Sequence, residues 1–182
     1  MLTDDVARVL IDEETIVQRV RALGAQVSAD YRDRDLLLLC ILKGGIVFLS
    51  DLMRCIEIPH GIEFMAISSY GAATDSSGIV RIVMDLEGSI LDRDVLLVED
   101  IVDTGNTLSY VKSILQTRGP RSLKICSLLN KPDRREVPLE IDYVGFDIPN
   151  EFVVGYGLDF AEKYRNLRFI GVLKPEMYTK PD

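Results

Sequence analysis

The stretch Val95-Leu-Leu-Val-Glu-Asp-Ile-Val-Asp-Thr-Gly-Asn-Thr107 is the most informative segment of this 182-residue chain for fold class. Its first four residues form an apolar run that is typical of a strand buried on both faces of a parallel sheet. Gly105 permits a tight turn, and a helix is predicted from about residue 107 to residue 117. A strand followed by a turn and a helix is the first half of a βαβ unit, where ligands bind beyond the carboxyl end of the strand.

The segments on either side continue this alternation of strands and helices. Residues 79–86 are predicted to return antiparallel to residues 62–69, with a mobile loop at residues 70–78. Asp12 is expected to cap a helix, and the first thirty residues are expected to pack as that helix against the sheet. The fold class is therefore α/β, a parallel Rossmann-like sheet flanked by helices in one domain. Further strands are predicted at residues 36–42, 123–129, 141–146, 152–154 and 169–172, and a helix at residues 46–53.

Composition excludes several classes of protein. The net charge of −8 argues against a nucleic-acid-binding protein, which needs a surplus of Lys and Arg. The cysteines Cys40, Cys55 and Cys126 lie far apart and form no C-x-x-C pair, which is typical of reduced thiols. No basic and apolar leader opens the chain, and no apolar run approaches membrane-spanning length. We expect a cytoplasmic protein with neither nucleic acid nor membrane as a partner.

Acidic residues crowd the end of the central predicted strand. Glu99, Asp100 and Asp103 are three like charges that stability alone would not gather. The amides and hydroxyls of residues 104–107 suit a phosphate, because the N-terminus of a helix favours an anion. The carboxylates suit ribose hydroxyls or a divalent cation. Taken alone, the same composition also fits an ordinary helix cap, while the Walker A and G-x-G-x-x-G motifs are missing.

With its flanking motifs, the segment resembles the type I phosphoribosyltransferases, and the C-terminal matches resemble their 6-oxopurine branch. The matches span roughly residues 36–172 and imply a core at about 36–130 and a hood mainly at about 131–175, with an N-terminal contribution. In chain order, the further motifs are Leu42-Lys-Gly-Gly45 for a pyrophosphate loop, Ser68-Ser-Tyr-Gly71 for a flexible loop, and Lys131-Pro132, Val144-Gly-Phe146 and Phe152-Val-Val-Gly-Tyr-Gly-Leu-Asp159 for a purine-binding hood.

The resemblance implies a magnesium-dependent pentosyltransferase of purine salvage. It would move the phosphoribosyl group of 5-phosphoribosyl 1-pyrophosphate to hypoxanthine, guanine or both, giving IMP or GMP and pyrophosphate. A homodimer or homotetramer and a cis peptide bond at Leu42–Lys43 are implied as well.

The resemblance also implies a role for each matching residue. Asp103 would be the general base, and Ser69 and Tyr70 would belong to the flexible loop that closes over the reaction. The other implied sites are the phosphate and ribose site with Glu99, Asp100, Asp103, Thr104, Gly105, Asn106 and Thr107; the pyrophosphate site with Lys43, Gly44 and Arg165; the purine site with Lys131, Phe152, Val153 and Asp159; and the Mg²⁺ site with Glu99, Asp100 and Asp159.

Several of these residues also have simpler interpretations. Without the resemblance, Lys43 reads as a surface lysine, Phe152 as a core aromatic residue and Arg165 as a solvated helix residue. Two other functions are a phosphoribosyltransferase for another base and a regulatory protein that kept the fold and binds nucleic acid. Lys131, Phe152 and Asp159 argue against the first, and the net charge with Lys43 and Asp103 argues against the second.

Overall fold

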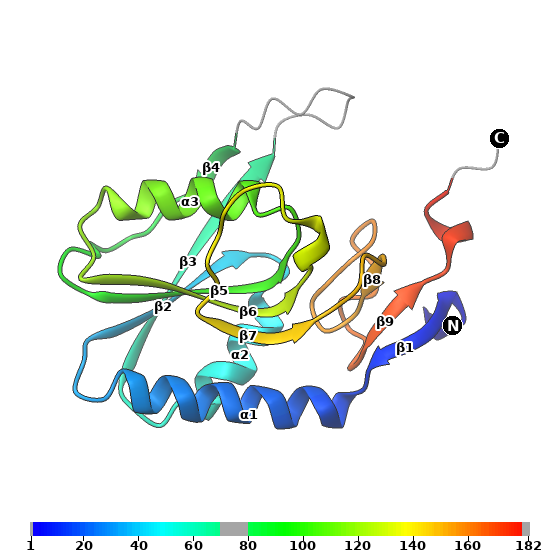
Figure 1. The fold of residues 1–182 in the computed structure, drawn as a ribbon, viewed down its shortest axis with the longest axis horizontal. Coiled ribbons are helices and arrows are strands. Elements are labelled where there is room, and N and C mark those ends of the chain that lie inside the picture. Colours follow the sequence, from blue (N-terminus) through cyan, green and yellow to red (C-terminus); the bar gives the residue numbers. More distant parts are fainter. Residues whose placement is uncertain (1, 70–79, 180–182) are drawn as a thin grey trace.

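The computed structural model describes residues 2–69 and 80–179, whose strands form two sheets (Figure 1). The larger sheet has the strand order β4-β3-β2-β5-β6-β7, and the smaller has the order β1-β9-β8. The strands are β1 (Val6–Ile11), β2 (Leu36–Leu42), β3 (His60–Ser69), β4 (Val80–Met84), β5 (Asp94–Val102), β6 (Ser122–Asn130), β7 (Tyr143–Asp147), β8 (Val153–Val154) and β9 (Ile170–Leu173). The helices are α1 (Glu13–Asp30), α2 (Ile46–Cys55) and α3 (Asn106–Gln116), with 3₁₀ helices η1 (Leu2–Asp5), η2 (Pro132–Arg134) and η3 (Pro175–Met177).

The parallel α/β sheet predicted from the sequence is confirmed. β2 pairs in parallel with β3 and β5, and β6 pairs in parallel with β5 and β7. β4 returns antiparallel to β3, as expected for the hairpin. The loop expected at residues 70–78 lies outside the described residues.

Helices cover both faces of the large sheet, which explains the uninterrupted apolar runs of its central strands. On β2, Leu38 and Cys40 face the cluster that contains α1 and α2, while Leu37 and Leu39 face the cluster that contains α3. Figure 1 shows α1 and α3 on opposite sides of the strands. The Asp12 side chain caps α1 as predicted, because it accepts a hydrogen bond from the Thr15 amide at 2.8 Å.

The chain leaves the neighbouring strands β2 and β5 toward opposite faces, since α2 follows β2 on one face and α3 follows β5 on the other. Such a change of direction opens a crevice at the carboxyl ends of the two strands, where α/β proteins bind ligands. Pairing of β2 with β5 ends at Cys40 and Val98, while β5 continues along β6 as far as Val102. Beyond Val98, one edge of β5 is therefore free of β2.

This pairing corrects the sequence-based end of the central strand. The two acids were expected to follow a strand over residues 95–98, but Glu99 and Asp100 lie inside β5. Glu99 is in register with Ser127 of β6, and Ile101 is in register with Leu129. An apolar run shows only which part of a strand is buried on both faces. Hydrogen bonding to β6 extends β5 beyond that run, as far as Val102.

A second correction concerns the first thirty residues, which do not form a single helix: η1 and the strand β1 precede α1. Residues 6–11 are the strand β1, which pairs antiparallel with β9, so that a strand from near each end of the described chain lies beside the other (Figure 1). The prediction failed because the partner strand lies near the other end of the sequence. The expected free thiols are confirmed, since Cys40, Cys55 and Cys126 form no disulfide and the first and last of them are buried.

Within residues 2–69 and 80–179, no helix combines the length and the apolar character that crossing a membrane requires.

Candidate active site

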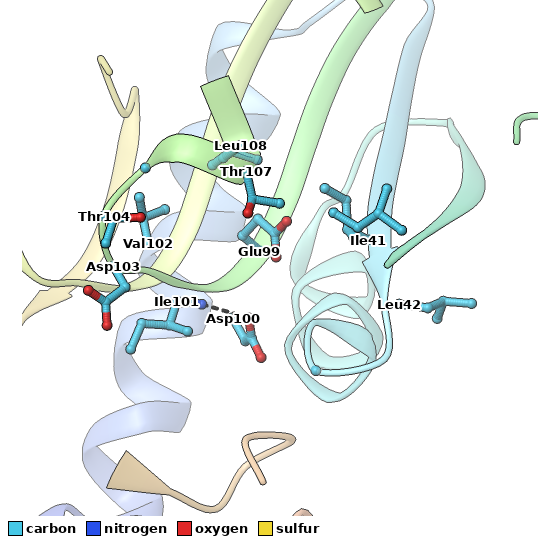
Figure 2. Close-up of a pocket in the computed structure, with 13 residues that line it drawn as sticks. Ile41, Leu42, Glu99, Asp100, Ile101, Val102, Asp103, Thr104, Thr107 and Leu108 are labelled. Atoms are coloured by element: carbon cyan, nitrogen blue, oxygen red, sulfur yellow. Dashed lines mark hydrogen bonds between the residues drawn. The ribbon is translucent and has the colours of Figure 1, made fainter. Parts of the chain in front are cut away.

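A cavity of about 290 Å³ lies at the carboxyl ends of β2 and β5. Figure 2 shows Ile41 and Leu42 of β2 on one side, with Glu99 and Asp100 of β5 and the following loop on the other. Gly44 also lines the cavity, together with Asp103, Thr104, Gly105 and Thr107. The crevice at the change of chain direction thus holds most of the predicted phosphate and ribose residues.

The loop between β5 and α3 has the conformation expected of an anion-binding turn. Gly105 adopts a φ of +85°, a left-handed conformation that residues with a Cβ rarely take. The first backbone hydrogen bond of α3 joins the Ser109 amide to the Gly105 carbonyl at 2.9 Å. The amides that precede Ser109 therefore have no acceptor within the helix, and together with the helix dipole they favour a phosphate.

The segment after β6 contacts this loop through hydrogen bonds. The Glu136 amide donates to the Thr104 carbonyl at 3.0 Å, and the Asn106 side-chain amide donates to the Glu136 carboxylate at 2.6 Å. A Cβ on Gly105 would lie 2.8 Å from a guanidinium nitrogen of Arg135. Sequence reasoning did not find Arg135 or Glu136, because no motif marks them and their roles depend on the turn after β6.

The adjacent acids of β5 sit where charge is costly. Burial raises the pKa of Glu99 well above its usual range, and the neighbouring charge of Asp100 adds to this rise. Burial also raises the pKa of Asp100 to about 6, although the Ile101 amide donates to its carboxylate at 2.8 Å and opposes the rise. A Cβ on Gly44 would lie only 1.8 Å from Asp100 Oδ2, so this carboxylate lies directly against the backbone that follows β2.

The raised pKa of Asp100 predicts how the ligand-free protein responds to pH. The neutral carboxyl is favoured in the folded state, so its stabilising effect is complete below the usual pKa of 3.8 and is lost as the pH rises through about 6. Asp100→Asn stays neutral, and we expect it to be more stable than the unsubstituted protein at pH 8 by up to about 3 kcal/mol.

Urea unfolding at pH 4 and at pH 8, without magnesium or substrates, measures this difference. Asp133→Asn is the matched control, because Asp133 is exposed. If the difference in unfolding free energy between Asp100→Asn and the unsubstituted protein stays constant with pH, the raised pKa of Asp100 is not its cause.

Asp103, the candidate general base, and Lys131, a predicted purine residue, lie close together where the loop between β5 and α3 begins. The ammonium group of Lys131 lies 3.4 Å from the Asp103 carboxylate, and Arg134 Nε lies 3.1 Å from its other oxygen. The residue Lys131 is only 7% exposed, and its amide donates to the Val102 carbonyl at 3.0 Å. Lys131 is therefore a mostly buried lysine whose charge is paired. Arg134 was not predicted, since nothing in the spacing distinguishes it from Arg135.

The turn after β8 packs against the loop after β2. The Leu42–Lys43 peptide bond is cis, as the resemblance implied. A Cβ on Gly157, whose φ is +100°, would lie 2.3 Å from the Gly44 carbonyl. Arg165 pairs with Asp159 at 2.8 Å, and the two residues shift the pKa of Asp100 in opposite senses, Arg165 downward and Asp159 upward. Two of the predicted pyrophosphate residues, Gly44 and Arg165, thus lie near Asp100 of β5, while Lys43 is exposed and pairs with Glu162.

The other predicted purine and flexible-loop residues that the structure describes do not line the cavity. Phe152 is half-exposed, stacks on Tyr178 with ring centres 4.9 Å apart, and meets Phe160 edge-on. Val153 is buried in β8, and of the described residues neither it nor Phe152 belongs to the cavity lining. Ser69 ends β3, and Tyr70 lies outside the described residues.

The predicted metal ligands do not form one cluster. In the part of the chain that the structure describes, no three side chains of His, Cys, Asp or Glu are placed to hold a metal ion. The carboxylate of Asp159 accepts the Glu162 amide at 2.8 Å and pairs with Arg165. A cation at Glu99 and Asp100 would therefore need further oxygen ligands from a substrate or from water.

Known proteins are similar to this chain in sequence and in fold. The model of the phosphoribosyl transferase domain family matches residues 10–161. The hypoxanthine-guanine phosphoribosyltransferase of Mycobacterium avium is 53% identical, with 97% of this chain and 90% of that protein covered. The protein of the same name from Streptococcus thermophilus is 46% identical, with coverage of 99% and 100%. A crystal structure of a hypoxanthine phosphoribosyltransferase from Staphylococcus aureus matches with a TM-score of 0.95 and 48% identity, covering 98% of this chain and 97% of the other.

Proposed function

This chain belongs to the phosphoribosyl transferase domain family, and we propose that it is a purine salvage enzyme acting on hypoxanthine, guanine or both. It transfers the phosphoribosyl group of phosphoribosyl pyrophosphate to the purine, giving IMP or GMP and pyrophosphate. The observation that carries this proposal is the meeting of Asp103 and Lys131 at the edge of an anion-binding loop. One crevice thereby combines a phosphate site, a candidate base and a buried donor.

Each part of the substrate has a matching group that lines the crevice or lies on a segment next to it. The amides and hydroxyls of residues 104–107 bind the 5′-phosphate, and Glu99 and Asp100 bind the ribose hydroxyls. Lys43, the Gly44 amide and Arg165 bind the pyrophosphate group, whose charge needs several donors. Ser69 and Tyr70 belong to the loop that closes over the reacting centre.

The reaction exchanges one bond at the anomeric carbon of the ribose. The bond to pyrophosphate oxygen breaks, a purine ring nitrogen forms the new bond, and the electron pair of the broken bond leaves with pyrophosphate. The Asp103 carboxylate accepts the proton that the ring nitrogen loses, and its charge also favours the positive charge developing on the sugar.

The purine is recognised at its edge and on its face. Lys131 donates to the exocyclic 6-oxygen, which an aminopurine lacks. Phe152 stacks on the ring, while the backbone of Val153 and the region of Asp159 contact the remaining edge.

Magnesium fits the acidic part of this site. The oxygens of Glu99 and Asp100 are ligands of the kind Mg²⁺ prefers, and their raised pKa values show that two charges are poorly solvated there. A bound Mg²⁺ would neutralise charge on these acids and on the pyrophosphate, and the side chain of Asp159 is the candidate for a second ion. We propose Mg²⁺ as the cofactor on this basis.

The organisation of the enzyme is also a proposal. Residues 1–182 would form one domain, with the core at about 36–130 and the hood mainly at about 131–175. Strand β1 supports an N-terminal contribution to the hood, because it pairs with β9. A cytoplasmic homodimer or homotetramer without nucleic-acid or membrane partners is expected, and the three free cysteines support a reducing compartment.

A substrate panel tests the proposed function. Purified protein with magnesium and phosphoribosyl pyrophosphate is mixed with hypoxanthine, guanine, xanthine or adenine, and the nucleotide is separated by chromatography. We expect IMP and GMP, each with one pyrophosphate per nucleotide, and little product from adenine. If neither hypoxanthine nor guanine gives a nucleotide, the proposal is lost.

A further inference from the structure

One carboxylate lies between the two cations that the proposed function assigns to pyrophosphate. Glu162 Oε2 is 3.2 Å from Lys43 Nζ and 3.5 Å from Arg165 Nη2. Lys43 comes from the loop after β2 and Arg165 from the turn after β8, so the two cations belong to different parts of the fold. A single oxygen of Glu162 therefore takes the place that an anionic substrate group would take between them.

Stability does not explain this arrangement. The Lys43 and Glu162 side chains are 68% and 66% exposed, and ion pairs with such exposure contribute little to folding. The backbone around Glu162 is nevertheless restrained, with a φ of +63° at Glu162 itself and +51° at Ala161. The Glu162 amide is tied to Asp159 Oδ2 at 2.8 Å, which fixes the turn. A left-handed conformation at residues with a Cβ is uncommon and often occurs at functional positions.

We propose that the Glu162 carboxylate is an internal substitute for pyrophosphate. In the free enzyme the carboxylate pairs with Lys43 and Arg165, and the pyrophosphate group of the substrate displaces it from both. This inference rests on the proposed function, because that function assigns the two cations to pyrophosphate. Glu162 is then a positioning residue that sets affinity at this end of the site.

The exchange follows from charge. Pyrophosphate carries several negative charges and offers more acceptor oxygens than one carboxylate, so it displaces Glu162 from both cations. The displaced carboxylate remains nearby as a like charge and weakens binding of the anion. The same competition favours release of pyrophosphate after transfer, a step of the kind that limits many enzymes.

A nearby alternative makes the opposite prediction. If Glu162 instead held Lys43 and Arg165 in the geometry that pyrophosphate needs, its neutralisation would loosen both cations and weaken binding. The sign of the change in affinity therefore separates a competing anion from a supporting one.

Glu162→Gln tests the inference, with Glu57→Gln as the matched control. Glu57 is exposed just beyond the C-terminus of α2, at the end of that helix away from Lys43, and the substitution removes the same charge. The measurements are the Kd of pyrophosphate with magnesium by calorimetry, the KM for phosphoribosyl pyrophosphate, and the Kd of IMP. We expect Glu162→Gln to bind pyrophosphate about two- to five-fold more tightly and to lower this KM to a similar extent.

Two comparisons make the test specific. The Kd of IMP should stay unchanged, because a nucleoside monophosphate has no group between Lys43 and Arg165. The gain in affinity should shrink at high salt, since screening weakens an exposed charge. Weaker binding of pyrophosphate by Glu162→Gln, or a change equal to that of Glu57→Gln, would overturn the inference. The proposed function fails separately, if the unsubstituted protein makes no nucleotide.

Discussion

Asp103→Asn is expected to lower kcat by about 10² to 10⁴-fold, the usual contribution of a general base, while the KM values change only a few-fold. The amide keeps the shape of the side chain. Lys131 and Arg134 contact different oxygens of the carboxylate, at 3.4 and 3.1 Å, and the single oxygen of the amide keeps only one of these two hydrogen bonds. It does not accept the purine proton, and it removes the negative charge near the sugar. The loss therefore belongs to the chemical step.

Steady-state rates over a range of both substrates measure this split between kcat and KM, and single-turnover rates confirm that chemistry has slowed. Asp133→Asn is the control, because Asp133 is an exposed acid of the neighbouring helix η2. If kcat for Asp103→Asn stays within a few-fold of the unsubstituted value, Asp103 is not the base.

Lys131→Met is expected to lower kcat/KM for hypoxanthine and guanine by about 10²-fold, because a buried charged donor is lost. The methionine side chain has nearly the volume of lysine, so little empty space is created at this 7% exposed residue. Lys131→Ala should show the same loss and a lower thermal stability, since it also leaves a cavity.

The ratio between purines isolates recognition from catalysis. Lys131 also pairs with Asp103, and any harm to the base would slow oxopurines and adenine alike. The ratio of kcat/KM for hypoxanthine to that for adenine should therefore fall in Lys131→Met. Lys112→Met, on α3, controls for the change in charge and should leave the ratio intact. An unaltered ratio in Lys131→Met would remove its role in selecting the 6-oxygen.

Local sequence was sufficient wherever a segment folds according to its own composition. The apolar runs at Leu36–Leu42 and Val95–Val98 predicted buried strands, and Asp12 predicted the start of α1. Gly105 predicted the tight turn before α3, and the structure shows it with a φ of +85°, which only a residue without a Cβ takes readily. Motif order predicted the family, since the pyrophosphate, phosphate and purine motifs follow one another along the chain.

Features that depend on pairing between distant segments could not be predicted from local sequence. Strand β1 exists because β9, near the other end of the chain, offers it a partner. Glu99 and Asp100 belong to β5 because β6 extends beyond β2, and no property of the two acids announces this. The burial that raises their pKa values is likewise a property of the crevice and not of the segment.

The amino-acid sequence alone thus established the class of fold, the family and the chemical type of each proposed site residue, because these follow from local patterns and motifs. Only the tertiary structure showed that Arg134 reaches Asp103 and that Glu162 lies between Lys43 and Arg165. The physical reason is that charges act over a few ångströms in space, while Arg134 and Asp103 are 31 residues apart along the chain and Glu162 and Lys43 are 119 residues apart. Val95–Thr107 by itself therefore predicts a buried strand, a turn and a helix, and the folded chain supplies the groups that surround them.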